Sequence, residues 1–254
     1  CLLMVHEKYI FAFIVICLSI YLRPTIEIFY PLIIIAFLYF YSQKKYIYIF
    51  KKISIFFVIY ILVLSPWWIH NYVKFNEFVR INLAPSYSLF LGNNELSNFE
   101  NIKYMRTGKN TSFNLSQFEE IKDPITKNKQ LRNHALNFIF ENPDKFVLLC
   151  INRFIHFWQL YPNADEYQNW KYILISCLSF GSILLFSFIY LINLNISQLK
   201  KIIPLILIIL SINLVHVLTI SSLRYRLPIE PFLIIFAANG LHITYDLILK
   251  YYKK

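Results

Sequence analysis

Glycine and charge are both scarce in this chain. It contains 4 glycines in 254 residues, and 15% of its residues are charged, whereas 57% are hydrophobic. The shortage of glycine argues against nucleotide-binding folds, which approach phosphates through glycine-rich loops. So little charge is atypical of a water-soluble domain of this length. The composition therefore predicts a protein solvated by a lipid bilayer, where α-helices are the default spanning element because they satisfy their own backbone amides.

Reactive and metal-binding patterns are also missing. The four cysteines, Cys1, Cys17, Cys150 and Cys177, are far apart in the sequence, so neither a disulfide framework nor a metal-binding pair is expected. No Ser, His and Asp arrangement or metal-ligand spacing stands out elsewhere. We therefore predict no catalytic residue, no metal and no cofactor within this chain. Because it starts with Cys1 and lacks a signal-peptide apolar region, we expect a fragment of a longer protein.

Six apolar runs cover most of the chain. They are residues 9–22, 26–42, 53–69, 172–194, 202–221 and 227–249. A bilayer core about 30 Å thick needs about 20 helical residues, and the last three runs are that long. The first run is shorter, so it spans only if Lys8 and Arg23 snorkel or if it forms half of a re-entrant pair. We predict an all-α polytopic membrane protein with about six hydrophobic helices.

The net charge of +11 is explained by where the lysines lie. The lysines form three clusters. One lies between the second and third runs (Lys44, Lys45, Lys51 and Lys52), one lies between the fourth and fifth runs (Lys200 and Lys201), and one ends the chain (Lys250, Lys253 and Lys254). Because cytoplasmic loops attract positive charge, these clusters predict a cytoplasmic C-terminus. The chain then divides into membrane helices (1–69), an outer segment (70–169) and further membrane helices (170–254). The expected partners are membrane lipids with anionic head groups and no nucleic acid, since the lysines do not mix with aromatic residues on a polar domain.

The outer segment contains two kinds of sequence. Its first half predicts loops with some extended structure. Its second half predicts helices, because Asp123 and Pro124 form a helix start, and Asn142 and Pro143 form a break. The helix after the break puts aromatic side chains on one face with Arg153 at its edge, which suits a helix that lies at the membrane interface.

An arginine followed by proline lies between the first two apolar runs. Proline stops a helix, so Arg23 before Pro24 and Thr25 is expected at a helix end, with Glu27 one helical step further on. One interpretation is a snorkelling arginine neutralised by Glu27, because both charges are costly at membrane depth unless they are paired or wet. The other is an arginine that binds a lipid phosphate at the outer membrane surface.

Polar residues also follow the third run and recur further along the outer segment. His70 and Asn71 adjoin two tryptophans typical of a membrane boundary, so they either contact a head group or a sugar, or are solvated. Tyr87, Asn93 and Asn94 lie in a stretch that turn chemistry explains completely. Amides and tyrosine rings also bind sugars through hydrogen bonds and stacking, which makes these three residues candidate sugar or acceptor contacts.

Two arginines lie in the outer turn before the last run, where the positive-inside rule disfavours them. Arg224, Tyr225 and Arg226 are followed there by Glu230. A pair of guanidinium groups can bind a phosphate and stabilise it as a leaving group, while Glu230 orients one of them. A purely structural Arg–Glu pair is the competing explanation. The candidate phosphate partners are therefore Arg23, Arg224 and Arg226, with Tyr225 in the same site.

Taken in order, these blocks resemble the second half of bacterial glycosyltransferases related to protein O-mannosyltransferases and to the aminoarabinose transferase that modifies lipid A. The corresponding stretches are residues 22–25, 66–72, 91–94, 153–158 and 224–228, which together extend over almost the whole chain. His70 departs from the family, which usually has arginine there, so a phosphate contact at this position would be absent or pH-dependent. The family's acidic catalytic residue lies in a first outer loop, upstream of this chain.

The resemblance implies a membrane enzyme that transfers a sugar from a polyprenyl-phosphate donor to a protein, lipid or glycan acceptor. The reaction would take place on the periplasmic face of the bacterial inner membrane. An upstream carboxylate would act as the base, while cationic groups stabilise the departing lipid phosphate. A divalent metal would be compatible with this chemistry, but nothing in the sequence supports one. The alternative is a transporter or flippase of lipid-linked glycans, which usually has internal repeats and polar residues near the membrane midplane.

Overall fold

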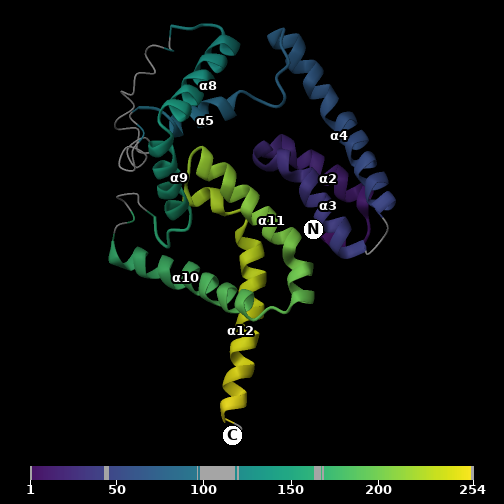
Figure 1. Cartoon of the computed structure of the whole chain (residues 1–254), viewed down its shortest axis with the longest axis vertical. Coiled ribbons are helices and arrows are strands. Elements are labelled where there is room, and N and C mark those ends of the chain that lie inside the picture. The colour runs from purple at the N-terminus through teal and green to yellow at the C-terminus, as the bar shows by residue number, and fades with distance from the viewer. Residues whose placement is uncertain are drawn as a thin grey trace.

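The computed structural model describes residues 2–42, 46–95, 97, 118, 120–162, 167 and 169–252. Every regular element in this part of the chain is helical, which confirms the predicted all-α class (Figure 1). The α-helices are α1 (Leu2–Val5), α2 (Tyr9–Leu22), α3 (Tyr30–Ser42), α4 (Tyr46–Phe75), α5 (Ala84–Gly92), α8 (Pro124–Glu141), α9 (Pro143–Phe157), α10 (Trp170–Ile192), α11 (Ile196–Leu218) and α12 (Glu230–Tyr252). Two 3-10 helices, η1 (Pro24–Phe29) and η3 (Leu223–Arg226), precede α3 and α12.

Four of the described helices, α4, α10, α11 and α12, are long and apolar enough to cross a membrane. Helices α2 and α3 are also apolar, but they have 14 and 13 residues, fewer than a bilayer core needs. The short length predicted for the first run is thus confirmed. The second run forms a shorter α-helix than predicted, because η1 takes its first residues and α3 begins only at Tyr30.

Helix α4 is longer than the third apolar run at both ends. It has 30 residues, includes Lys51 and Lys52 near its start, and continues through Pro66. Proline has no backbone N–H, so the carbonyl of Leu62 loses its helical partner at this point. The hydroxyl of Ser65 donates a long hydrogen bond to that carbonyl over 3.4 Å, which compensates in part for the missing bond. The helix therefore extends beyond both ends of the third apolar run.

The middle of the chain, residues 76–162, differs from the prediction in its first half. Loops with some extended structure are predicted there, but residues 84–92 form α5, and no strand occurs in the described residues. Part of the loop prediction falls on residues 98–117, outside the part that the structure describes. Phe90 of α5 is fully buried against Leu131 and Ala135 of α8. This tertiary packing outweighs the local preference of the segment for turns.

The predicted helix boundaries in the second half of this segment are confirmed. Asp123 precedes α8, and its carboxylate accepts hydrogen bonds from the backbone N–H groups of Ile125 and Thr126, over 3.4 and 2.8 Å. This is the expected N-terminal cap of a helix that starts with proline. Helix α8 ends at Glu141, and α9 starts at Pro143, on the other side of the predicted break.

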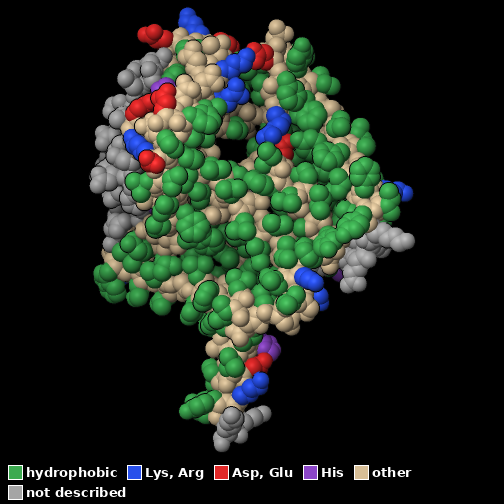
Figure 2. Space-filling model, viewed as in Figure 1, with side chains coloured by type: hydrophobic (Ala, Val, Ile, Leu, Met, Phe, Trp, Pro, Cys, Tyr) green, Lys and Arg blue, Asp and Glu red, His purple; other side chains and the backbone are tan. Residues whose placement is uncertain are grey.

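Helices α2, α3 and α11 lie in the centre of the view in Figure 1, with α4 on one side and α5, α8 and α9 on the other. Figure 2 shows hydrophobic side chains over most of the visible face, while charged groups gather near one end and around the projecting end of α12. Only 11% of the most apolar 18-residue stretch of α10 is buried within the protein. Such a surface suits contact with lipid tails, because a water-soluble protein rarely exposes so large an apolar patch.

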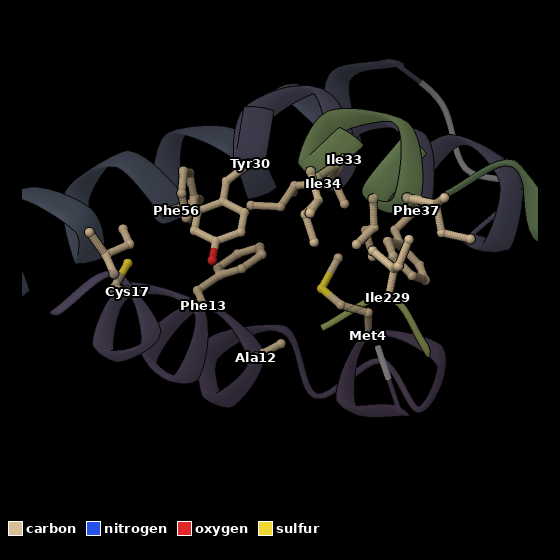
Figure 3. Packing of buried hydrophobic residues seen from close by; sticks show 14 of the residues in the cluster. Met4, Ala12, Phe13, Cys17, Tyr30, Ile33, Ile34, Phe37, Phe56 and Ile229 are labelled. Carbon is tan, nitrogen blue, oxygen red and sulfur yellow. The ribbon is translucent and has the colours of Figure 1, made fainter. Parts of the chain in front are cut away.

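The main core lies where α2, α3, α4 and α11 meet. In Figure 3 the aromatic rings of Phe13, Tyr30 and Phe56, from three different helices, lie next to one another. The rings of Phe13 and Phe56 meet edge to face, with centroids 5.5 Å apart. This is a favoured arrangement of aromatic pairs and fixes the position of α2 against α4.

A close helix contact fastens α12 to α10. The hydroxyl of Ser187 on α10 donates a hydrogen bond to the carbonyl of Leu233 on α12 over 2.8 Å. Further along, a Cβ atom added to Gly240 would lie 1.8 Å from the carbonyl oxygen of Phe186. Small residues commonly allow such approaches between membrane helices.

We expect Gly240→Ala to lower the free energy of unfolding by about 1–3 kcal/mol, because the methyl group forces the two backbones apart. Gly181→Ala is the matched control, since its Cβ atom would lie 4.0 Å from the nearest atom, the Cδ1 atom of Leu160. Thermal unfolding of both variants in the same detergent tests this. Equal midpoints would contradict the close packing of α10 and α12.

Candidate functional site

Two distant segments of the chain, residues 19–30 and 212–228, line a cavity of about 150 Å³. The end of α2, the η1 turn with the start of α3, and the end of α11 with the η3 turn all contribute side chains. Residues that line it include Ser19, Arg23, Thr25, Tyr30, His216 and Tyr225. We call this cavity the Tyr225 pocket. It brings Arg23 and Tyr225, which are about two hundred positions apart in the sequence, into one site.

The position of Arg23 follows from the proline after it. Helix α2 ends at Leu22, and Arg23 has an extended backbone, with φ −154° and ψ 94°. A residue before proline disfavours the helical conformation, because the proline ring collides with its backbone. The helix therefore stops here, as the sequence predicts. Arg23 is left as an exposed side chain at the mouth of the Tyr225 pocket.

The ring of Tyr225 is the centre of the site. It stacks on the ring of His216, with centroids 4.2 Å apart and planes at 2°. The guanidinium carbon of Arg23 lies 5.6 Å from the Tyr225 centroid, and that of Arg224 lies 5.2 Å from it. Both distances are within the range of cation–π attraction. Two positively charged groups therefore lie beside one aromatic ring, and one of them, Arg23, also lines the cavity.

His216 has a defined hydrogen-bonding role. Its Nδ1 atom lies 3.2 Å from the carbonyl oxygen of Ile220. A carbonyl can only accept, so Nδ1 carries the hydrogen, and Nε2 keeps a lone pair that can accept another hydrogen bond. The ring is also stacked against Phe157 of α9, 6.3 Å away. The sequence interpretation missed His216, although a histidine inside an apolar run is an indication of a functional position.

Glu27 is not the partner of Arg23. Its buried carboxylate accepts a hydrogen bond from the hydroxyl of Tyr60 on α4. Its second oxygen lies 3.1 Å from the Nε atom of Arg80, whose side chain is half exposed. The described structure thus pairs Glu27 with Arg80 and leaves Arg23 facing the Tyr225 pocket. The interpretation of Arg23 as a side chain neutralised by Glu27 is not supported.

Arg226 lies apart from the other two arginines. It is buried, and its Nε atom lies 3.1 Å from Oε1 of Glu230. Its Nη1 atom donates a hydrogen bond to the carbonyl of Gln159 over 2.8 Å, and its guanidinium group lies over the ring of Phe180. Burial lowers the pKa of Arg226, while the hydrogen bond and charge of Glu230 oppose that change. The structural Arg–Glu pair is therefore the arrangement found, and Arg226 does not line the pocket with Arg23.

The three candidate asparagines are buried and bind backbone. Asn71 donates hydrogen bonds to the carbonyls of Val79 and Ile81, over 2.8 and 3.2 Å. Asn93 and Asn94 follow α5, and their amides donate to carbonyls of the same helix. These bonds fix the end of α4 and the end of α5. None of the three asparagines lines the Tyr225 pocket.

His70 and Tyr87 are exposed and lie elsewhere. His70 is near the end of α4, where its ring stacks on that of Trp67 with centroids 5.4 Å apart. Tyr87 lies on α5 with 42% of its surface exposed. The structure therefore does not bring either residue to the Tyr225 pocket. Of the nine residues that the sequence proposes, it gathers Arg23, Arg224 and Tyr225.

Arg153 forms a buried junction between the ends of two helices. Only 1% of its surface is exposed, so the prediction that it lies at the edge of an interfacial face is wrong. Its Nη1 atom donates to the carbonyls of Val217 and Leu218 at the end of α11, over 3.0 and 3.3 Å. Its Nη2 atom donates to the carbonyl of Gly92 and, over 3.1 Å, to Oδ1 of Asn93. One guanidinium group thus joins the ends of α5 and α11.

The ends of these two helices are in direct contact at the junction. A Cβ atom on Gly92 would lie 1.9 Å from the carbonyl oxygen of Thr219, so only glycine fits there. The carbonyl ends of helices carry partial negative charge, which favours a cation between them. Burial lowers the pKa of Arg153 to about 10, which still leaves the side chain charged at neutral pH.

The described residues include no group of three or more His, Cys, Asp or Glu side chains placed to hold a metal ion. Comparison with known proteins adds no family, because no family model, curated protein or solved structure matches the chain.

Proposed function

We propose that this chain is part of a membrane glycosyltransferase that uses a polyprenyl-phosphate-linked sugar as donor. In this proposal the Tyr225 pocket receives the phosphate at the periplasmic face of a bacterial inner membrane, and the C-terminus is cytoplasmic. The acceptor is a protein, lipid or glycan. The observation that carries the proposal is the convergence of Arg23 and Arg224 on Tyr225, beside a cavity at the ends of apolar helices.

The chemistry of the pocket favours a phosphate ligand. Guanidinium groups form charge-assisted hydrogen bonds with phosphate oxygens, and two of them can share the negative charge of one phosphate. Stabilising the departing phosphate in this way lowers the barrier to sugar transfer. The apolar helices that end at the pocket would accommodate an isoprenoid chain. In this proposal the base that activates the acceptor is a carboxylate upstream of residue 1.

The position of the polar groups favours an enzyme over a transporter. Transporters usually bind their substrate near the membrane midplane, between broken helices in repeated halves. Here Arg23 follows the last residue of α2, and Arg224 lies in the η3 turn between α11 and α12. Such positions at helix ends suit a reaction at the membrane surface.

Binding of a polyprenyl phosphate to the chain in phosphatidylcholine nanodiscs tests the proposal. We expect Arg23→Gln and Arg224→Gln each to weaken binding about tenfold, because a hydrogen bond to a charged group contributes about 1.5–3 kcal/mol. Arg132→Gln is the matched control, since Arg132 is exposed on α8 and away from the pocket. Unchanged binding by the Arg23→Gln/Arg224→Gln double variant would refute the phosphate assignment.

A further inference from the structure

A second cavity lies at the opposite end of α2 from Arg23. It has a volume of about 620 Å³, and its wall includes Lys8, Tyr9 and Lys52. Helix α2 has 14 residues, so about 20 Å separates its two ends, next to which Lys8 and Arg23 lie. The two cavities are therefore separate sites at opposite ends of one apolar helix.

A fixed turn carries Lys8 into the wall of this cavity. Glu7 adopts a left-handed backbone with φ 57°, which is uncommon for a residue other than glycine. The N–H of Lys8 donates to the carbonyl of Leu3 over 2.9 Å, and the N–H of Glu7 donates to that of Met4 over 3.2 Å. These two bonds are the pattern that closes the end of a helix with a left-handed residue. These bonds stabilise the turn from α1 into α2.

Lys52 enters the same cavity from α4. Its ammonium nitrogen lies 4.9 Å from the centroid of Tyr9 and 5.4 Å from that of Tyr48. Both contacts are within cation–π range, so the two rings hold the charge in place. Glu7 is the acidic residue of the cavity wall, and the exposed Lys51 adds a further positive charge beside Lys52. The lysines therefore outnumber the carboxylate.

An apolar wall continues from the lysines along α2. Ile10, Phe11 and Val15 line the cavity, and they are 55%, 66% and 55% exposed. From Lys8 to Val15 the helix rises about 10 Å, which is about a third of the thickness of a bilayer core. A ligand that fits both walls has a negative charge at one end and a hydrocarbon chain at the other.

We infer that this cavity is a binding site for an anionic phospholipid. Lys8 and Lys52 bind the phosphate of the head group, and one acyl chain lies against Ile10, Phe11 and Val15. Juxtamembrane lysines attract anionic lipids, and the cavity adds a shape that a flat lysine cluster lacks. The inference is independent of the proposed sugar transfer, because it concerns the other end of α2.

The test compares lipid binding by two double variants of the chain that remove equal charge. In nanodiscs that contain phosphatidylcholine with a minor fraction of labelled phosphatidylglycerol, K8Q/K52Q is expected to retain about tenfold less phosphatidylglycerol than the unmodified chain. K200Q/K250Q removes two exposed lysines outside the cavity, and it is expected to retain several times more phosphatidylglycerol than K8Q/K52Q. Circular dichroism confirms that both variants remain helical.

Three results would overturn the inference. Equal loss in both double variants would mean that only overall charge attracts the lipid. Normal retention by K8Q/K52Q would mean that the cavity does not bind it. Displacement of the phosphatidylglycerol by inorganic phosphate in the buffer would mean that the cavity takes a soluble anion rather than a lipid.

Discussion

Replacing Arg153 with methionine is expected to lower the free energy of unfolding by about 3–5 kcal/mol. The guanidinium group of Arg153 donates to carbonyls of Gly92, Val217 and Leu218, at the ends of two helices. Methionine fills much of the same space but donates no hydrogen bond, so these carbonyls are left in a buried region with fewer partners. Thermal unfolding in detergent, followed by circular dichroism, measures the loss.

Two further variants separate this effect from a general loss of charge. Arg132→Met removes an exposed arginine from α8, and we expect the unfolding midpoint to stay the same. Arg153→Lys keeps the charge, but a single ammonium group does not reproduce the fork of donors that reaches both helix ends, so an intermediate loss is expected. A midpoint for Arg153→Met equal to that of Arg132→Met would show that the junction contributes nothing to stability.

Arg226→Ala is expected to destabilise the fold by about 2–3 kcal/mol, whereas Arg224→Ala changes stability by less than about 0.5 kcal/mol. Arg226 is buried against Phe180 and paired with Glu230, so its removal leaves a partly buried carboxylate without its partner. Arg224 is exposed and contacts mainly the ring of Tyr225. The same thermal measurement applied to both variants makes the comparison.

The Arg226–Glu230 pair can also be tested by a double-mutant cycle. If the two side chains stabilise each other, the variant Arg226→Met/Glu230→Gln loses less stability than the sum of the single variants. Strict additivity would indicate that Arg226 acts through its contact with Phe180 or its bond to Gln159 instead. Either outcome leaves the phosphate test of Arg23 and Arg224 unaffected, because it concerns different side chains.

Local chemistry made several helix boundaries predictable. Pro24 fixes the end of α2 at Leu22, and the carboxylate of Asp123 with Pro124 fixes the start of α8. Both rules act between residues close in sequence. Pro66 is the counterexample, because α4 continues through it where the hydroxyl of Ser65 bonds the carbonyl that proline leaves unpaired. The sequence pattern alone does not show that a nearby side chain will bond the carbonyl that a proline leaves without its helical partner.

The candidate site was predictable only in part, for a related reason. An arginine or asparagine in a sequence shows what it can bind, but its partner depends on which segments meet in space. Arg226 pairs with Glu230, and the amide of Asn93 donates hydrogen bonds to backbone carbonyls. Arg23, in contrast, lines a cavity. His216 lies inside an apolar run, and its place beside Tyr225 depends on how α11 and η3 pack.

The junction at Arg153 also sets an order of events during synthesis. The amide of Asn93 binds the carbonyl of Leu218, which is 125 residues further along the chain. At about 5–20 residues per second, a ribosome needs roughly 6–25 s to make that stretch. During this interval Arg153 can already bind the carbonyl of Gly92, but the carbonyls of Val217 and Leu218 do not yet exist, so the junction is completed only after α11 has been made.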